Sequence, residues 1–398
     1  MSLKKISLVL LLIFCAEKHY AQKDSSKSKI PAICINEDLP DSNLVFTGTK
    51  ITEKEGDYAA GGKITMSGYV STYYAHYTDT SGKEGFQKFP TVAPRNDQFG
   101  LNIAEVSFKY SGNTFRGIFT THYGDIPVSA WSQTYNYIQE AHIGVKLAKK
   151  LWFDAGFFRT HIGLESIQPR ENMTVSLATV TYYEPYFLSG AKLTYQISDK
   201  LTVQLNAFNG YNTFIETNKN KAFGFSTVYE PTKNLSLTFN TITSDETPDY
   251  ISKKHQRVYN NLYGVYRSQK LTIGAEVNYG IGQHYGLVDT NATASMFSAL
   301  LAVKYSIRSK FSIYGRGEYF SDDNEMLTGP IEGDAHKYVG LNVAGATLGL
   351  EFKFIVNSYL RIENRFLETL RSDEKIFLLD NKSSNYRNES IVCFGIWF

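Results

Sequence analysis

The stretch "YRNESIVCFGIWF" (386–398) decides the fold, because its charged residues all have one parity and a row of apolar residues has the other. Four apolar side chains share one parity: Val392, Phe394, Ile396 and Phe398. Arg387 and Glu389 have the opposite parity. Successive side chains of a β-strand point to opposite faces, so this alternation predicts a strand with one apolar and one polar face.

The same period of two recurs along the chain. It is clearest in five stretches: "LTVQLNA" (201–207), "LSLTFN" (235–240), "LTIGAEVNY" (271–279), "LGLEFKF" (348–354) and "YLRIENRF" (359–366). Many alternating stretches run ten residues or more, whereas strands of soluble proteins average five or six. A strand of about ten residues crosses a bilayer at a tilt. The pattern therefore favours strands that span a membrane.

Short and long connections alternate between these strands. Seven tight turns are centred near Gly112, Lys149, Asp199, Lys233, Gln269, Ser309 and Asn357. Eight longer polar connections cover 78–98, 125–136, 161–182, 211–221, 245–257, 283–294, 321–340 and 371–385. Bacterial outer-membrane barrels have an even strand number, short periplasmic turns and long extracellular loops, and must close because lipid leaves no backbone group unpaired. We predict an all-β, transmembrane, antiparallel up-and-down β-barrel of about 16 strands over 64–398. A secreted β-sandwich or propeller is the alternative.

The first 21 residues have the layout of a signal peptide. Lys4 and Lys5 precede the apolar run 6–16, and a small-residue cleavage site follows at Ala21. Lipid attachment at Cys15 is a weaker alternative. Export agrees with a location in the bacterial outer membrane. Residues 22–63 are predicted to form a periplasmic or lumenal segment, and whether it plugs the lumen stays open.

Charge and motifs exclude several classes of protein. Removing 1–21 takes three lysines and one glutamate from 41 basic and 39 acidic residues, which leaves 38 of each. A nucleic-acid-binding protein needs an excess of basic residues, so this charge balance argues against that class of protein. The histidines are dispersed and neither G-x-S-x-G nor a metal-ligand spacing occurs, so we predict no enzyme, cofactor or metal site. Cys34 and Cys393 remain, and whether they pair is open because two cysteines form no disulfide framework.

The alternation also predicts which side chains line a pore. An arginine facing lipid at mid-membrane costs about 2–4 kcal/mol, which fixes the charged face inward. The predicted inward residues are Glu105, Lys109, Arg116, Glu140, His142, Lys146, Asp154, Lys192, Gln204, Glu276, Lys304, Arg316, Glu318, Glu351, Lys353, Arg361, Glu363 and Arg365. A barrel of this width leaves an aqueous channel. Basic residues slightly outnumber acidic ones in this set, which permits a mild anion preference.

Two further segments have predicted roles. The connection 161–182 carries Glu165, Arg170 and Glu171, and by analogy with general porins we predict that it folds inward and narrows the pore. The ending with Phe394, Ile396 and Phe398 resembles the signal that barrel-assembly machinery recognises in outer-membrane proteins. Its glycine, Gly395, is displaced from the usual place.

Four stretches resemble the OmpL-like type of β-barrel porins, which are common in Bacteroidetes. They are "RNDQFGLNIAEVSFKY" (95–110), "WFDAGFFRTHIGLES" (152–166), "YEPYFLSGAKLTYQISDKLTVQLNAFNGYN" (183–212) and "KAFGFSTVYEPTKNLSLTFNTITSDE" (221–246). The resemblance implies an outer-membrane porin for passive diffusion of small hydrophilic solutes, and supplies no established site residues. A phosphate-selective or other substrate-specific porin, and a non-conducting adhesion or anchor barrel, are the alternatives. The expected partners are outer-membrane lipid, barrel-assembly machinery and small hydrophilic solutes, with a homotrimer by analogy.

Overall fold

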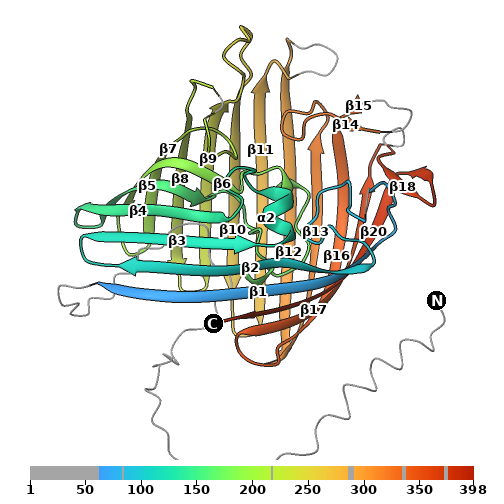
Figure 1. Ribbon diagram of the computed structural model, residues 1–398, viewed down its shortest axis with the longest axis horizontal. Helices are drawn as coiled ribbons and strands as arrows, with labels where there is room; N and C mark the ends of the chain where they lie inside the picture. The colour runs from blue at the N-terminus through green and yellow to red at the C-terminus, as the bar shows by residue number, and fades with distance from the viewer. Residues whose placement is uncertain (1–61, 83–84, 217, 286–290, 334–337, 372–374) are drawn as a thin grey trace, which may run out of the picture. The chain divides into compact units, whose positions relative to one another are not determined.

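Sixteen strands close into one antiparallel barrel in the computed structural model, which describes residues 62–82, 85–216, 218–285, 291–333, 338–371 and 375–398. Each strand pairs with the next along the chain, and the last pairs with the first (Figure 1). The strands are β1 (Lys63–Tyr77), β2 (Gln98–Ser111), β3 (Phe115–Tyr123), β4 (Ile138–Ala148), β5 (Leu151–Arg159), β6 (Phe187–Gln196), β7 (Leu201–Phe208), β8 (Ala222–Thr232), β9 (Leu235–Asp245), β10 (Gln256–Arg267), β11 (Leu271–Gln283), β12 (Thr293–Arg308), β13 (Phe311–Asp322), β16 (Leu341–Phe352), β17 (Ser358–Thr369) and β20 (Tyr386–Trp397). The predicted up-and-down barrel is confirmed. The predicted signal peptide, residues 22–61 and Cys34 lie outside the described residues.

The short turns meet at one end of the barrel and the long connections at the other, as the alternation predicted. The long connections contain small elements that the sequence analysis did not predict. These are α2 (Asp125–Ala130), the 3-10 turns Pro169–Glu171 and Val180–Tyr182, and the hairpins β14 (Ile331–Glu332) with β15 (Tyr338–Val339) and β18 (Phe377–Leu379) with β19 (Lys382–Ser384). Within the described ranges, no helix has the length and apolarity to cross a bilayer.

The barrel closes where β20 pairs with β1 and β17. Tyr69 lies opposite Trp397, and the backbone N–H groups of Gly68 and Phe398 each donate to the other residue's carbonyl at 3.0 Å. A Cβ atom on Gly68 would lie 2.4 Å from the Phe398 ring, so the close approach of this ring requires glycine. Cys393 lies on the inner side of this closure as a buried free thiol.

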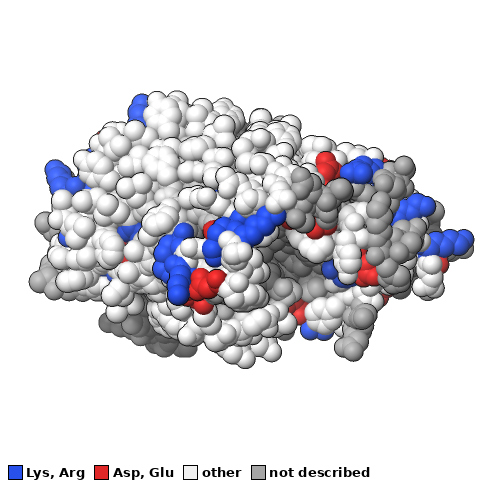
Figure 2. Space-filling view, turned by 90° about the horizontal axis from the view of Figure 1, so that it is seen from above, with Lys and Arg blue, Asp and Glu red and all other residues white. Residues whose placement is uncertain are grey.

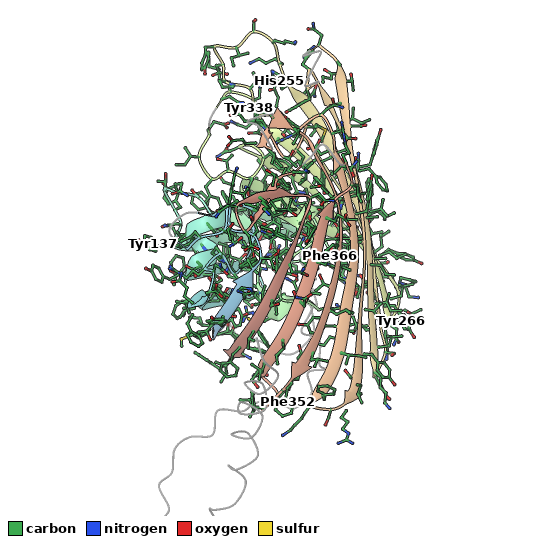
Figure 3. All side chains as sticks on the ribbon, turned by 90° about the vertical axis from the view of Figure 1, so that its right-hand side faces the viewer. Tyr137, His255, Tyr266, Tyr338, Phe352 and Phe366 are labelled. Carbon is green, nitrogen blue, oxygen red and sulfur yellow. The ribbon has the colours of Figure 1, made fainter. Side chains whose placement is uncertain are left out.

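The two faces of the barrel differ as the alternation predicts. On β10, Leu262 is 54% exposed on the outer face and its neighbour Tyr263 is 2% exposed. Figure 3 shows Tyr266 projecting from the outer surface and Phe352 at the end with the short turns, while His255 and Tyr338 lie at the end with the long connections. Seen from above, a broad part of the surface is uncharged, and the lysine, arginine, aspartate and glutamate side chains gather toward the middle and the right of the view (Figure 2). An apolar exterior and buried polar side chains inside are the reverse of a soluble barrel.

Candidate channel site: the inner wall and the inward loop

The connection between β5 and β6, residues 160–186, folds into the barrel, and we call it the inward loop. Most of its side chains are buried, with Val175 and Thr179 at 0% exposure. Its backbone reaches the far wall, because Gly163 N–H donates to Asn261 Oδ1 at 3.2 Å and Leu164 N–H to Glu276 Oε2 at 2.9 Å. The inward loop therefore crosses the lumen.

Two carboxylates of the wall hold the backbone of the inward loop. Glu363 on β17 accepts hydrogen bonds from the N–H groups of Val175 at 2.6 Å and Ser176 at 2.8 Å. Glu318 on β13 accepts from Thr179 N–H. Charge-assisted hydrogen bonds of this kind are stronger than neutral ones, so these amides are fixed although no secondary structure pairs them.

The carbonyl groups of the inward loop are satisfied by arginines of the wall. Arg361 on β17 donates to the carbonyls of Pro169 at 2.6 Å, Asn172 at 2.9 Å and Thr174 at 3.0 Å. Its Nε also donates to Glu351 at 2.7 Å. One planar guanidinium thus binds three loop carbonyls and a wall carboxylate, which a lysine could not do.

Neighbouring arginines extend this network. Arg316 donates to Glu165 of the inward loop at 2.8 Å and to the Ser176 carbonyl at 2.6 Å. Arg365 bonds to Glu318 at 2.9 Å and to Thr179 Oγ1 at 3.1 Å. Seven charged residues of β13, β17 and β20 that face the lumen are each at most 8% exposed, and we call these seven the sealed wall: Arg316, Glu318, Arg361, Glu363, Arg365, Arg387 and Glu389.

The part of the wall beyond β1, from β2 to β4, is more accessible to water. On β2, β3 and β4, five charged or titratable side chains are partly or fully exposed, and we call them the open wall: Lys109, Arg116, Glu140, His142 and Lys146. Arg116 forms an ion pair with the buried Asp154 of β5. Arg170, predicted in the constriction loop, bonds to Glu105 on β2 at 2.8 Å. The inward loop thus touches this side too, but leaves more of the wall uncovered.

Apart from Lys353, which follows the end of β16, the predicted inward residues lie on the strand face opposite the apolar exterior, and their role as a pore wall remains a prediction. Glu105, Asp154, Lys192, Gln204, Glu276, Arg316, Glu318, Glu351, Arg361, Glu363 and Arg365 are buried, whereas Lys109, Arg116, Glu140, His142, Lys146, Lys304 and Lys353 keep some exposure. Lys304 pairs with Glu351 at 2.6 Å. Of the predicted constriction residues, Glu165 reaches the sealed wall, while Arg170 and Glu171 face the β2–β5 side.

The predicted inward set omits several charged residues that the structure places inside, among them Arg159, Arg387 and Glu389. Arg159 ends β5 and pairs with Glu171, and Arg387 and Glu389 pair on β20. The parity of Arg387 and Glu389 in 386–398 was the signal that they face inward. Arg159 has no such signal, because the alternation stops where β5 leads into the inward loop.

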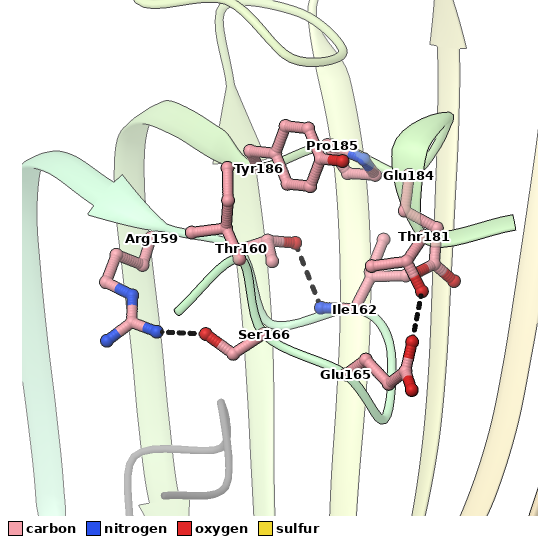
Figure 4. Close-up of a pocket in the computed structure, with 10 residues that line it drawn as sticks. Arg159, Thr160, Ile162, Glu165, Ser166, Thr181, Glu184, Pro185 and Tyr186 are labelled. Atoms are coloured by element: carbon pink, nitrogen blue, oxygen red, sulfur yellow. Dashed lines mark hydrogen bonds between the residues drawn. The ribbon is translucent and has the colours of Figure 1, made fainter. Parts of the chain in front are cut away.

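The two ends of the inward loop meet around a small space of about 10 Å³. Figure 4 shows its lining, where Arg159 donates to Ser166 Oγ at 2.6 Å and Thr181 Oγ1 to Glu165 Oε2 at 3.4 Å. A space of this size holds about one water molecule. The inward loop is therefore packed against itself as well as against the wall.

Two titratable groups of the inward loop are kept neutral by this packing. Burial, with Glu276 nearby, raises the pKa of Glu184 well above its ordinary value, and Tyr259 donates to Glu184 Oε1 at 2.7 Å. A Cβ atom on Gly163 would lie 2.4 Å from Glu184 Oε2, and Gly163 has φ +93°, so glycine is required beside this carboxyl. Burial, then the charge of Lys192, lowers the pKa of His161 to about 3.

Fold and interior together define a class of protein. A closed 16-stranded barrel with an apolar exterior, charged side chains inside and a long connection folded into the lumen is the architecture of an outer-membrane channel. In the described part of the chain, no group of histidine, cysteine or carboxylate side chains is arranged to hold a metal ion.

The chain belongs to the family described as "Putative beta-barrel porin-2, OmpL-like", whose model matches residues 63–398. The protein is thus an outer-membrane porin, a channel rather than an enzyme by family and fold. The comparison with curated proteins finds no match.

Solved structures share the fold at low sequence identity. The anion-selective porin from Comamonas acidovorans has a TM-score of 0.55 and 9% identity, over 85% of this chain and 100% of that one. The outer-membrane channel DcaP of Acinetobacter baumannii has a TM-score of 0.57 and 10% identity, over 86% and 99%. In-vitro folded OmpT of Vibrio cholerae, described as a trimer form, has a TM-score of 0.50 and 13% identity, over 85% and 99%.

Proposed function

We propose that the porin lets small hydrophilic solutes diffuse past the open wall, along a route narrowed by the inward loop, with a mild preference for anions. One observation carries the anion preference. In four lumenal ion pairs the cation is 17–19% exposed and the carboxylate 1–3%: Arg116–Asp154, Arg159–Glu171, Arg170–Glu105 and Lys304–Glu351.

This asymmetry gives the water-filled part of the lumen a basic surface. Water and solute meet the guanidinium and ammonium groups, while the balancing carboxylates lie behind them. A cleft lined by one sign of charge raises the local concentration of the opposite ion. Because each cation still has a nearby carboxylate, the net field is weak, and the preference is expected to be mild.

The same pairing argues against a phosphate-selective site. Such a site calls for a cluster of unpaired inward lysines or arginines at the constriction. Arg159 and Arg170 each bond to a carboxylate at the inward loop, and the arginines of the sealed wall are taken up by loop carbonyls and glutamates. A general porin therefore fits the geometry better than a phosphate-specific one.

The reversal potential of single channels in a planar bilayer under a KCl gradient tests this proposal. We expect an anion-selective sign, reduced in Lys109→Gln on the open wall and unchanged in Lys233→Gln, whose side chain lies in the turn between β8 and β9. The effect of Lys109→Gln should fade at 1 M salt, where the screening length is about 3 Å. A cation-selective native channel would overturn the anion preference, and a barrel without conductance would favour the anchor alternative.

We further propose a homotrimer in outer-membrane lipid, assembled by barrel-assembly machinery. The trimer form among the structural neighbours supports the first part. The outward, exposed side chains of Phe394, Ile396 and Phe398 on the last strand support the others, because they are available to lipid or to an assembly factor. Chemical cross-linking in native membranes tests the trimer, and a solely monomeric pattern would contradict it.

A further inference from the structure

Four of the long connections enclose a cavity of about 640 Å³ at the loop end of the barrel, and we call it the vestibule. Its lining comes from residues 86–94, 126–133, 167–187 and 212–215. The volume falls in the range of about 300–1,000 Å³ that is typical of small-molecule sites. The vestibule, which the inward loop helps to line, is therefore large enough to bind a small solute.

The lining of the vestibule is almost free of charge. Lys88 is the only charged residue among the described residues that line it, and its ammonium group lies 3.7 Å from Glu332 with the side chain half exposed. Six aromatic residues contribute instead: Phe86, Phe89, Trp131, Tyr182, Tyr186 and Phe187. This contrasts with the charged lumen beneath, and it suits an uncharged solute that has apolar faces.

The vestibule also has polar groups to direct such a solute. Gln87 Oε1 is buried and accepts no hydrogen bond within the described residues, while Gln87 Nε2 donates to the Asp79 carbonyl at 3.4 Å. An atom with no accessible surface faces protein and not the cavity, so the polar contact comes instead from Gln133, whose exposed side chain also lines the vestibule. Thr213 and Asn212 add further polar groups to the rim.

The cavity walls are held in place without a ligand. Asn102 Nδ2 donates to the Val92 carbonyl at 2.8 Å, and Trp131 Nε1 to the Ile138 carbonyl at 2.8 Å. Tyr186 N–H donates to Asn212 Oδ1 at 2.8 Å, which joins two of the four connections. A preformed site loses less conformational entropy on binding.

We propose that the vestibule binds a free, uncharged saccharide of one or two rings. The C–H faces of a sugar ring pack on aromatic side chains, and its hydroxyls bond to amide and hydroxyl groups, so both parts of the lining are used. The absence of a free charge disfavours a phosphate or a carboxylate ligand. The inference concerns binding at the entrance and does not rest on the anion preference proposed for the lumen.

Trp131 provides the readout. The chain has three tryptophans, and the other two, Trp152 on β5 and Trp397 on β20, do not line the vestibule. In detergent-solubilised Trp152→Phe/Trp397→Phe protein, we expect at least one of maltose, lactose, cellobiose and N-acetylglucosamine to change Trp131 emission saturably. Sorbitol, an acyclic polyol without a ring face, should give no saturable change.

Two substitutions test the contacts. Gln133→Ala should weaken binding of the responding sugar about 3- to 10-fold, the usual effect of losing one hydrogen bond. Lys233→Gln, in the turn between β8 and β9 and outside the vestibule, should leave it unchanged. No saturable response to any of the four saccharides, an equal response to sorbitol, or undiminished binding in Gln133→Ala would each overturn the proposal. None of these readouts requires ion current. A failure of saccharide binding can therefore be distinguished from a failure of the anion preference, which the reversal potential tests.

Discussion

The sealed wall and the open wall contain the same types of charged residue, but these residues have different roles in the two walls. On β13 and β17, Arg316, Arg361 and Arg365 are nearly inaccessible because the inward loop supplies the carbonyls and hydroxyls that they bind. On β2 to β4, Lys109 and Arg116 keep contact with water. A charge on a barrel wall is thus a structural anchor or a solute contact according to what the inward loop covers, and residue type alone does not decide which.

Deleting 164–176 should have the largest effect on this difference. The deletion removes the loop carbonyls of Pro169, Asn172 and Thr174 that Arg361 binds, and opens the sealed wall to water. Because a 16-stranded barrel without an inward segment leaves a wide aqueous channel, single-channel conductance should rise several-fold. An unchanged conductance in the planar bilayer would mean that the inward loop does not restrict the pore.

Substituting one anchor should have a smaller effect, on stability. Arg361→Ala leaves three buried carbonyls without a donor and weakens the surroundings of Glu351, so we expect a loss of about 3–5 kcal/mol in the free energy of unfolding. Arg361→Lys should recover part of this loss. Lys109→Ala on the open wall is the matched control, with an expected change within about 0.5 kcal/mol. Urea unfolding followed on gels measures all three, and equal losses for Arg361→Ala and Lys109→Ala would remove the distinction between the walls.

The smallest effect should be a pH dependence from Glu184. Its pKa is raised in the folded state, so the native protein binds more protons than the unfolded chain above the ordinary carboxyl pKa of about 4.3. Stability should therefore be full below that value and fall as the pH rises toward the raised pKa. Glu184→Gln should flatten this part of the profile in urea unfolding at several pH values. An identical slope in the variant would show that Glu184 does not carry the dependence.

The barrel could be predicted from the sequence because lipid imposes a simple rule on every strand. Outward positions must be apolar, so the alternation in "YLRIENRF" shows which of its residues face lipid and which face the lumen. Tight turns such as the one near Lys233 show where strands end. The strand number and the placement of long and short connections followed from this rule. Short elements within the connections, such as α2, have too few residues to show a period.

The contacts inside the barrel could not be predicted in the same way. Glu363 has the parity of an inward residue, but nothing in the sequence links it to the amides of Val175 and Ser176, which lie almost 190 positions away. The inward loop has no hydrogen-bond ladder of its own, so its path depends on side chains from many strands at once. The vestibule has the same origin, since four separate connections enclose it.

The pairing of β1 with β20 has a consequence for the timing of biosynthesis. Tyr69 cannot meet Trp397 until more than three hundred intervening residues have been made, so no part of the ring can close while the chain is still emerging. Until then the first and the last strand of the open sheet have unpaired backbone N–H and C=O groups, which can pair with other chains. The whole polypeptide must therefore be kept from aggregating during transit. An incomplete chain cannot close a barrel, so its edge strands stay unpaired.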